Sequence, residues 1–173
     1  MLDTFDLPAL PFVFFRRGSW QKAENVMWGT RGGAPVKLFD YAYSLDARHE
    51  EFRYFTCAVT TIAAACPWLC LTHEGSLASL GAIGTPDVQL EYDDFNRRFH
   101  VNCEQQFAFT LLDGRMMEWL MGNDRFARVE VVGPWVLVVR AQQQPDAWPE
   151  MAVWLDGFRA HVPDLVYSSH PPI

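Results

Sequence analysis

The sequence lacks the short motifs by which many enzymes and nucleotide-binding proteins are recognised. It contains no G-x-S-x-G nucleophile motif, no G-x-G-x-x-G dinucleotide fingerprint and no phosphate-binding P-loop. The usual sequence indications of acyl transfer, dinucleotide binding and nucleotide binding are therefore missing. We expect from this that the chain is not an enzyme and that it uses no cofactor.

Basic residues are also fewer than acidic ones, 14 against 21. The formal net charge is −7 and the isoelectric point is near 5.1. Sequence-independent binding of nucleic acid needs a basic face that neutralises phosphates, so we expect no nucleic-acid partner. The same balance disfavours direct docking on anionic lipid headgroups.

The four cysteines lack the spacing of a disulfide framework. Cys57 and Cys66 lie in an apolar run, and Cys70 and Cys103 follow at irregular intervals. We expect buried free thiols in a reducing compartment. Cys66, Cys70 and His73 do not have the spacing of a common zinc module, and a strand would send Cys70 and His73 to opposite faces, so no metal site is expected.

We also expect neither a secretory leader nor a membrane span within this sequence. Residues 1–10 contain two aspartates and no basic residue. Residues 54–72 carry no charge, but they contain four threonines and Pro67, which favour two buried strands separated by a turn at Pro67 over a membrane helix. Any membrane anchor is expected to lie outside this chain.

What the sequence does contain is a large apolar and aromatic share. Hydrophobic residues make up 50% of the 173 residues and aromatic residues 14%, which fits one globular domain over residues 1–173. An extended entry segment is expected at 1–22, followed by a sheet over 23–141 with helices inserted at 93–121, and by a helix at 146–162. About seven strands are predicted, at 23–30, 35–44, 52–65, 68–72, 87–92, 126–132 and 135–141. The first two are expected to form a hairpin about the Gly-rich loop 31–33, and the last two a hairpin about Gly133–Pro134. This order of elements predicts an α+β fold with a mainly antiparallel sheet and helices packed on it.

The inserted stretch 93–121 is the densest block of aromatic and long apolar residues. Asp93 is a suitable N-cap for one helical turn, and residues 100–103 follow as a short strand or extended connector. A helix is expected from Glu104, and a second one capped by Asp113 is expected to end at Gly122. Strand 35–44 has apolar residues in both alternating sets, which suggests that both of its faces are covered.

Two groups of residues in this region could in principle carry out chemistry. Cys103 and His100 suggest a thiol nucleophile held by an imidazole, but residues three apart in an extended segment face opposite ways. Glu91 and Asp93 belong to an acidic cluster that could supply a carboxylate pair, although helix capping already explains Asp93. An enzyme built on these groups stays open as a third hypothesis.

Four segments carry a resemblance to a known family. They are N-V-x-x-G-x-x-x-G-x-x-V-x-L-F-D-Y-x-Y at 25–43, P-W-L-x-L at 67–71, V-Q-L-E-x-x-D-F-N-R-R-F-x-V at 88–101 and F-A-x-x-L-L-D-x-R-M-M-E-W-L at 107–120. In order and spacing they resemble an actinobacterial family of membrane-anchored proteins of unknown function. Most members have an N-terminal transmembrane helix followed by one cytosolic domain, whereas this chain lacks the helix and has Gly114 where many relatives have Pro.

The resemblance also implies a cellular setting and a kind of partner. Domains of the trehalose monomycolate transport factor type are membrane-anchored cytosolic partners of the lipid exporter that builds the mycobacterial outer envelope. By this resemblance we expect a non-enzymatic adaptor at the cytosolic side of the plasma membrane, with a membrane protein as its partner. The alternative is a binding domain for a lipid or other apolar molecule, with a cavity built from Trp119, Trp135 and their neighbours.

A docking face for such a partner is expected on the inserted helices. Arginine is common among interface anchors, and a basic patch on an acidic domain is a plausible docking signal. The candidate partner-binding residues are Arg97, Arg98, Arg115, Met117 and Trp119. Core packing is the competing interpretation for the methionine and the tryptophan.

Overall fold

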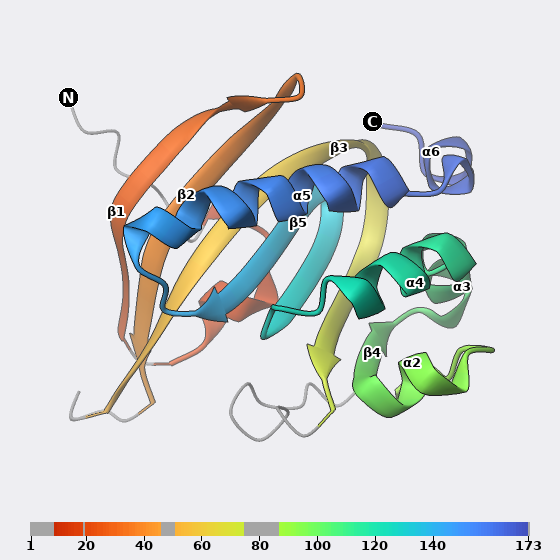
Figure 1. Cartoon of the computed structure of the whole chain (residues 1–173), viewed down its shortest axis with the longest axis horizontal. Coiled ribbons are helices and arrows are strands. Elements are labelled where there is room, and N and C mark those ends of the chain that lie inside the picture. Colours follow the sequence, from red (N-terminus) through yellow and green to blue (C-terminus); the bar gives the residue numbers. More distant parts are fainter. Residues whose placement is uncertain (1–8, 19, 46–50, 75–86, 173) are drawn as a thin grey trace.

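A five-stranded antiparallel sheet forms the centre of the computed structural model, which describes residues 9–18, 20–45, 51–74 and 87–172. The strands are β1 (Trp20–Arg31), β2 (Ala34–Ser44), β3 (Phe52–His73), β4 (Phe99–Cys103) and β5 (Arg128–Ala141). β5 follows β3 along one edge, while β2 and β4 pair with the two ends of its other edge. β1 pairs with β2 and ends the sheet (Figure 1). The predicted α+β fold is confirmed.

The helices cover one face of this sheet. They are α2 (Asp93–Arg98), α3 (Gln105–Leu111), α4 (Gly114–Gly122), α5 (Trp148–His161) and α6 (Asp164–Ser169), with a short 3-10 turn, η3 (Pro145–Ala147), before α5. Their buried residues, including Phe95, Leu111 and Leu155, share one hydrophobic core with Val36 and Val138 of the sheet. No helix among these residues is long and apolar enough to cross a membrane.

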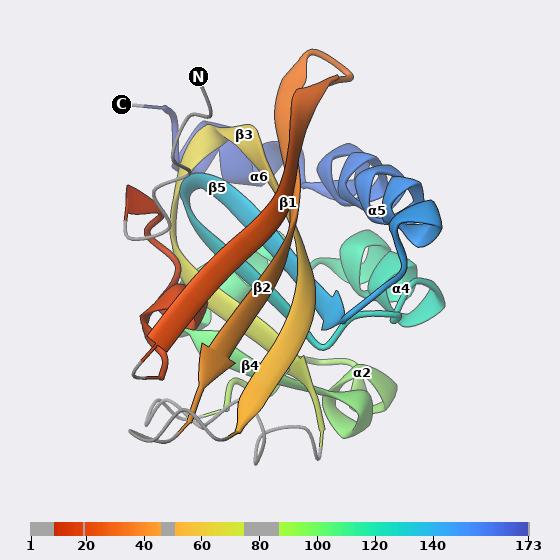
Figure 2. The same cartoon turned by 90° about the vertical axis from the view of Figure 1, so that its left-hand side faces the viewer.

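The N-terminal segment covers the opposite face. Phe12, Phe14 and Phe15, around the 3-10 helix η2 (Val13–Arg16), pack with Phe39 and Tyr41 of β2 in a second core. Figure 2 shows the sheet between this segment and helices α5, α4 and α2. The predicted coverage of strand 35–44 on both faces is confirmed. Part of the expected entry segment, residues 1–8, lies outside the described residues, and the part around η2 is helical instead of extended.

The predicted turn at Pro67 is wrong, because β3 runs through it as one strand. The register between β3 and β5 slips between Cys66 and Leu69, so Pro67 lies in a bulge. A strand tolerates proline at such an irregularity, where its missing N–H is not needed for pairing. The two predicted strands at 52–65 and 68–72 are thus a single element.

The predicted hairpin at Gly133–Pro134 is also wrong. β5 pairs with β3 in one direction on both sides of this site, so the chain bends there without reversing. Gly133 supplies the bend with a φ of +56°, a value that glycine adopts without the steric cost of a side chain. The strands predicted at 126–132 and 135–141 are therefore one strand.

The predicted strand at 87–92 is likewise not formed. Asp87 makes an isolated bridge to Asn102, and the side chain of Asn96 hydrogen-bonds both the N–H and the C=O of Leu90, at 2.9 and 2.7 Å. An amide side chain thus replaces the neighbouring strand that Leu90 would need. The sheet therefore has five described strands where about seven were predicted. Two pairs of predicted strands are single strands, the strand at 87–92 is not formed, and β4 is added.

The inserted helices follow the sequence pattern closely. The Asp113 carboxylate accepts a hydrogen bond of 2.8 Å from Met116 N–H, which is the expected N-cap of α4. The expected N-cap role of Asp93 is wrong: Tyr92 occupies the N-cap of α2, without a side-chain capping hydrogen bond, and Asp93 lies in the first turn. α6 was not predicted, and the helix expected at 146–162 begins at Trp148 and ends at His161.

Candidate docking surface

The five candidate partner-binding residues lie in different environments in the structure. Arg97 is exposed at the outer side of α2 and pairs with Asp94. Arg98 donates a hydrogen bond of 2.9 Å to the C=O of Met121 and pairs with Asp124 at 3.5 Å. Arg98 therefore ties α2 to the end of α4, while the guanidinium of Arg97 faces solvent.

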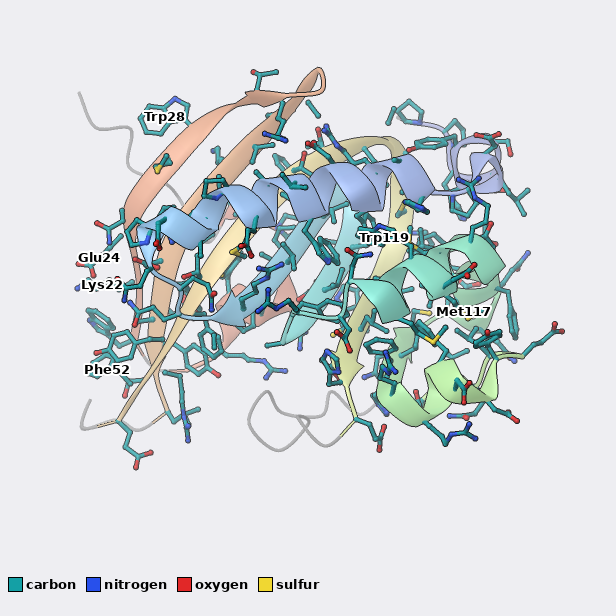
Figure 3. The ribbon with its side chains drawn as sticks, in the orientation of Figure 1. Lys22, Glu24, Trp28, Phe52, Met117 and Trp119 are labelled. Atoms are coloured by element: carbon teal, nitrogen blue, oxygen red, sulfur yellow. The ribbon has the colours of Figure 1, made fainter. Side chains whose placement is uncertain are left out.

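The other three candidates lie on α4. Arg115 is exposed, whereas Met117 is buried in the core shared with the sheet, so its side chain is not part of an exposed face. Trp119 is half-buried and lies between α4 and α5, where its ring stacks on His161 with centroids 5.2 Å apart. In Figure 3, Trp119 lies on the α5 side of the helix and Met117 on the α2 side. The candidates do not form one continuous patch around the methionine and the tryptophan.

The aromatic cavity expected from Trp119 and Trp135 is not formed by these two residues. Trp119 packs against Trp154 and Phe158 in the helix layer. Trp135 packs against the second core, beneath the N-terminal segment. The two rings thus lie on opposite faces of the sheet.

Cys103 has the environment of an inert thiol. Burial raises its pKa to about 12, although a backbone hydrogen bond from Ala108 opposes this shift. His100 points its Nδ1 at the carboxylate of Asp87, 3.3 Å away. A nucleophilic cysteine needs a lowered pKa, so this pair lacks the activation that thiol chemistry requires. Burial likewise raises the pKa of Cys66 to about 11 and that of Cys70 to about 12.

The edge strand β1 offers a different surface. Its two halves differ in how well they are protected against pairing with another chain. In the first half, Lys22 and Glu24 form an ion pair and Asn25 adopts a φ of +54° at a bulge. Charges and bulges are the features by which natural edge strands avoid pairing with other chains. The first half of β1 is therefore protected.

The second half of β1 lacks both features between the bulge and its last residue, Arg31. Met27, Trp28, Gly29 and Thr30 are uncharged and pair in regular register with β2. Trp28 is 66% exposed and Met27 58% exposed. Figure 3 shows Trp28 on the outer side of the strand, away from the helices. An uncharged, apolar edge of this kind is a site for pairing with another chain.

A groove of about 190 Å³ lies beside these residues. Its lining comes from residues 27–31 of β1, from Val36 and Leu38 of β2, and from Ala152 of α5. The groove therefore joins the β1 edge to the first half of α5. We call Met27, Trp28, Gly29, Thr30 and this groove the β1 edge surface.

Contacts with α5 hold the β1–β2 hairpin in place. Arg31 pairs with Asp156, and Arg159 donates hydrogen bonds to Asp156 and, at 2.8 Å, to the C=O of Arg31. Partial burial opposes ionisation of Asp156, but the hydrogen bonds from Arg31 and Arg159 lower its pKa below the ordinary value. The β1 edge surface is thus presented by a hairpin that is attached to the helix layer.

Sequence reasoning did not identify the β1 edge surface. The residues at 23–30 were correctly assigned to a strand, but a strand pattern does not reveal whether the strand lies at the centre or at the edge of its sheet. The available signal was local: two adjacent large apolar residues, Met27 and Trp28, would place one side chain on each face of the strand.

Comparison with known proteins gives one informative match. No protein-family model matches the sequence, and no curated protein matches it. The fold is similar to the crystal structure of the mycobacterial trehalose monomycolate transport factor A, TtfA, with a TM-score of 0.58 and 16% sequence identity. The similarity covers 87% of this chain and 75% of the other. The chain therefore shares its fold with a lipid transport factor.

Proposed function

We propose that this domain is a non-enzymatic adaptor at the cytosolic face of the plasma membrane, where it docks on a membrane protein that exports envelope lipids. The fold that it shares with a trehalose monomycolate transport factor supports the transport setting. The observation that carries the docking is the exposure of Met27 and Trp28 on the unprotected half of an edge strand.

The occupant of the β1 edge surface is an extended segment of the partner protein. Among the described strands, only β2 pairs with β1, so the outer backbone N–H and C=O groups of β1 can pair with an added strand. Met27 and Trp28 lie on opposite faces of β1, where each can cover the apolar side chains of such a segment. Backbone pairing would supply affinity, and the two side chains would supply selectivity for an apolar sequence.

The dimensions of the groove favour this adaptor over the lipid-binding alternative. Its volume is about 190 Å³, whereas pockets that enclose small molecules usually measure about 300–1,000 Å³. A larger hollow, of about 470 Å³, includes two arginines and a glutamate in its lining, and these charged groups oppose the burial of an acyl chain.

Capture of the partner from native membranes tests the proposal. We expect the tagged chain to recover an envelope-lipid exporter, identified by mass spectrometry, and we expect Trp28→Lys to abolish that recovery, because a lysine on the edge strand opposes pairing. Since Trp28 is largely exposed, the free energy of unfolding of the variant should lie within about 0.5 kcal/mol of that of the parent chain.

Two control variants make this experiment specific. Leu165→Lys changes an equally apolar residue on α6 that is 58% exposed, and it should leave recovery unchanged. Arg97→Glu reverses one exposed charge of α2 and tests the alternative docking face formed by Arg97, Arg98 and Arg115, the arginine face. Loss of the exporter with Arg97→Glu and its retention with Trp28→Lys would place docking on the arginine face and contradict the role of β1.

A further inference from the structure

A hollow of about 470 Å³ lies between the end of β5 and the first turn of α5, on a different part of the molecule from the β1 edge surface. Its lining includes Arg140 of β5 and Glu150 of α5. It also includes Arg125 and Phe126 from the segment before β5. Its size falls in the range of pockets that hold small molecules, about 300–1,000 Å³. Its charged lining indicates the chemistry of what it would hold.

Arg140 is the buried cation of this pocket. It is only 8% exposed, and within the described part of the chain its Nε–H has no hydrogen-bond partner. Burial lowers the pKa of Arg140, and the nearby Glu150 carboxylate opposes this shift. A buried guanidinium whose donors are not all satisfied costs free energy, so an oxyanion that pairs with the Arg140 guanidinium would be favoured.

The pocket holds more positive than negative charge. Nη1 of Arg140 lies 3.6 Å and Nη1 of Arg125 lies 4.0 Å from the same oxygen, Oε2 of Glu150. Both distances exceed the roughly 2.7–2.9 Å of a charge-assisted hydrogen bond. Glu150 is 61% exposed at its side chain, so a single, partly solvated carboxylate balances two arginines.

The start of α5 adds to this potential. The pocket reaches Ala147 and Glu150 at the N-terminal end of this 14-residue helix, and Ala147 offers no side-chain cap. The N-terminal end of a helix carries a partial positive charge that favours bound anions. Two arginines and a helix end thus converge on one pocket in a chain whose net charge is −7.

From this arrangement we propose that the pocket binds the phosphate group of a small molecule. Arg140 and Arg125 would donate to the phosphate oxygens in the bidentate manner for which the guanidinium is suited. The carboxylate of Glu150 competes with the ligand for both arginines. The phosphate can belong to a soluble ester or to a phospholipid headgroup, because both present the same oxygens.

Calorimetric titration of the chain with inorganic phosphate and with glycerol 3-phosphate tests the proposal. We expect saturable binding in the millimolar range or tighter. Arg125→Gln should weaken it by about threefold or more, whereas Glu150→Gln should tighten it by about three- to tenfold, because the competing carboxylate is removed. A gain on removal of Glu150 is not expected from a purely structural ion pair.

Vesicles and a matched control complete the experiment. Arg97→Gln removes another largely exposed arginine, outside the pocket, and should leave binding unchanged. Binding to phosphatidylglycerol vesicles, but to neither soluble phosphate, would assign the phosphate to a lipid headgroup, provided that Arg125→Gln weakens it. The proposal is overturned if neither the parent chain nor Glu150→Gln binds any phosphate, or if Arg125→Gln and Arg97→Gln bind alike.

Discussion

At the scale of single residues, Glu130 of β5 holds the N-terminal segment against the sheet. Its carboxylate accepts hydrogen bonds from Val13 N–H at 2.6 Å, Phe14 N–H at 3.2 Å and the indole of Trp68 at 2.8 Å. Nε of Arg128 donates to it at 3.0 Å. Neither Glu130 nor Arg128 has more than 1% of its surface exposed. A charge can be buried in this way only when it is paired and hydrogen-bonded.

Removal of this carboxylate should therefore be costly. Glu130→Gln leaves the guanidinium of Arg128 buried without a counter-ion, and we expect the free energy of unfolding to fall by about 3–5 kcal/mol. Equilibrium unfolding in urea measures the loss. Glu24→Gln is the control, because the Glu24 side chain is 54% exposed and its ion pair with Lys22 is worth at most about 1 kcal/mol. Equal losses for the two variants would contradict the importance of the buried pair.

At the scale of elements, α4 and α5 meet around the indole of Trp119. This ring contacts Trp154, with centroids 5.1 Å apart, and it also lies over Gly157. A Cβ added at Gly157 would lie 2.5 Å from the Trp119 ring, closer than atoms can pack. Glycine is thus required inside α5, although it is about 1 kcal/mol less favourable than alanine in a helix.

This contact predicts a reversal of the usual effect of glycine-to-alanine substitution. Gly157→Ala should lower the free energy of unfolding by about 1–2 kcal/mol, because the clash with Trp119 outweighs the gain in helix propensity. In a Trp119→Leu background the same substitution should become neutral or stabilising. Thermal or urea unfolding of the four proteins measures the coupling. Stabilisation by Gly157→Ala in the parent chain would contradict the close contact.

Among the elements, those with a regular periodic pattern were predictable from the sequence. The β1–β2 hairpin followed from its alternation and its Gly-rich loop, and α5 followed from apolar residues at spacings of three and four. Pro67 and Gly133–Pro134 were misread as turns, because the same residues also serve bulges and bends. Whether a chain reverses or only bends there depends on the strand beside it, and here β3 and β5 pair along both sides of the bend.

At the scale of the whole molecule, one sheet is covered on both faces, and no described strand pairs with the outer edge of β1. The helices bury one face and the N-terminal segment buries the other, so the strand order determines which residues remain exposed (Figure 2). That order places Met27 and Trp28 at the outer edge. The sequence analysis could name the arginines of α2 and α4 as candidate docking residues, because charge is visible in the sequence itself. It missed the β1 edge surface, because the position of a strand in its sheet is not.

The proposed docking depends on the addition of a partner strand to β1, and hydrogen exchange tests that step most directly. The chain and its complex with the captured exporter would be compared by mass spectrometry over peptides covering residues 20–31, 93–98 and 114–122. We predict slower exchange at residues 27–30 in the complex, because an added strand would hydrogen-bond the outer amides of β1. Protection confined to α2 and α4, with unchanged exchange in β1, would contradict the account and return the docking face to the arginines.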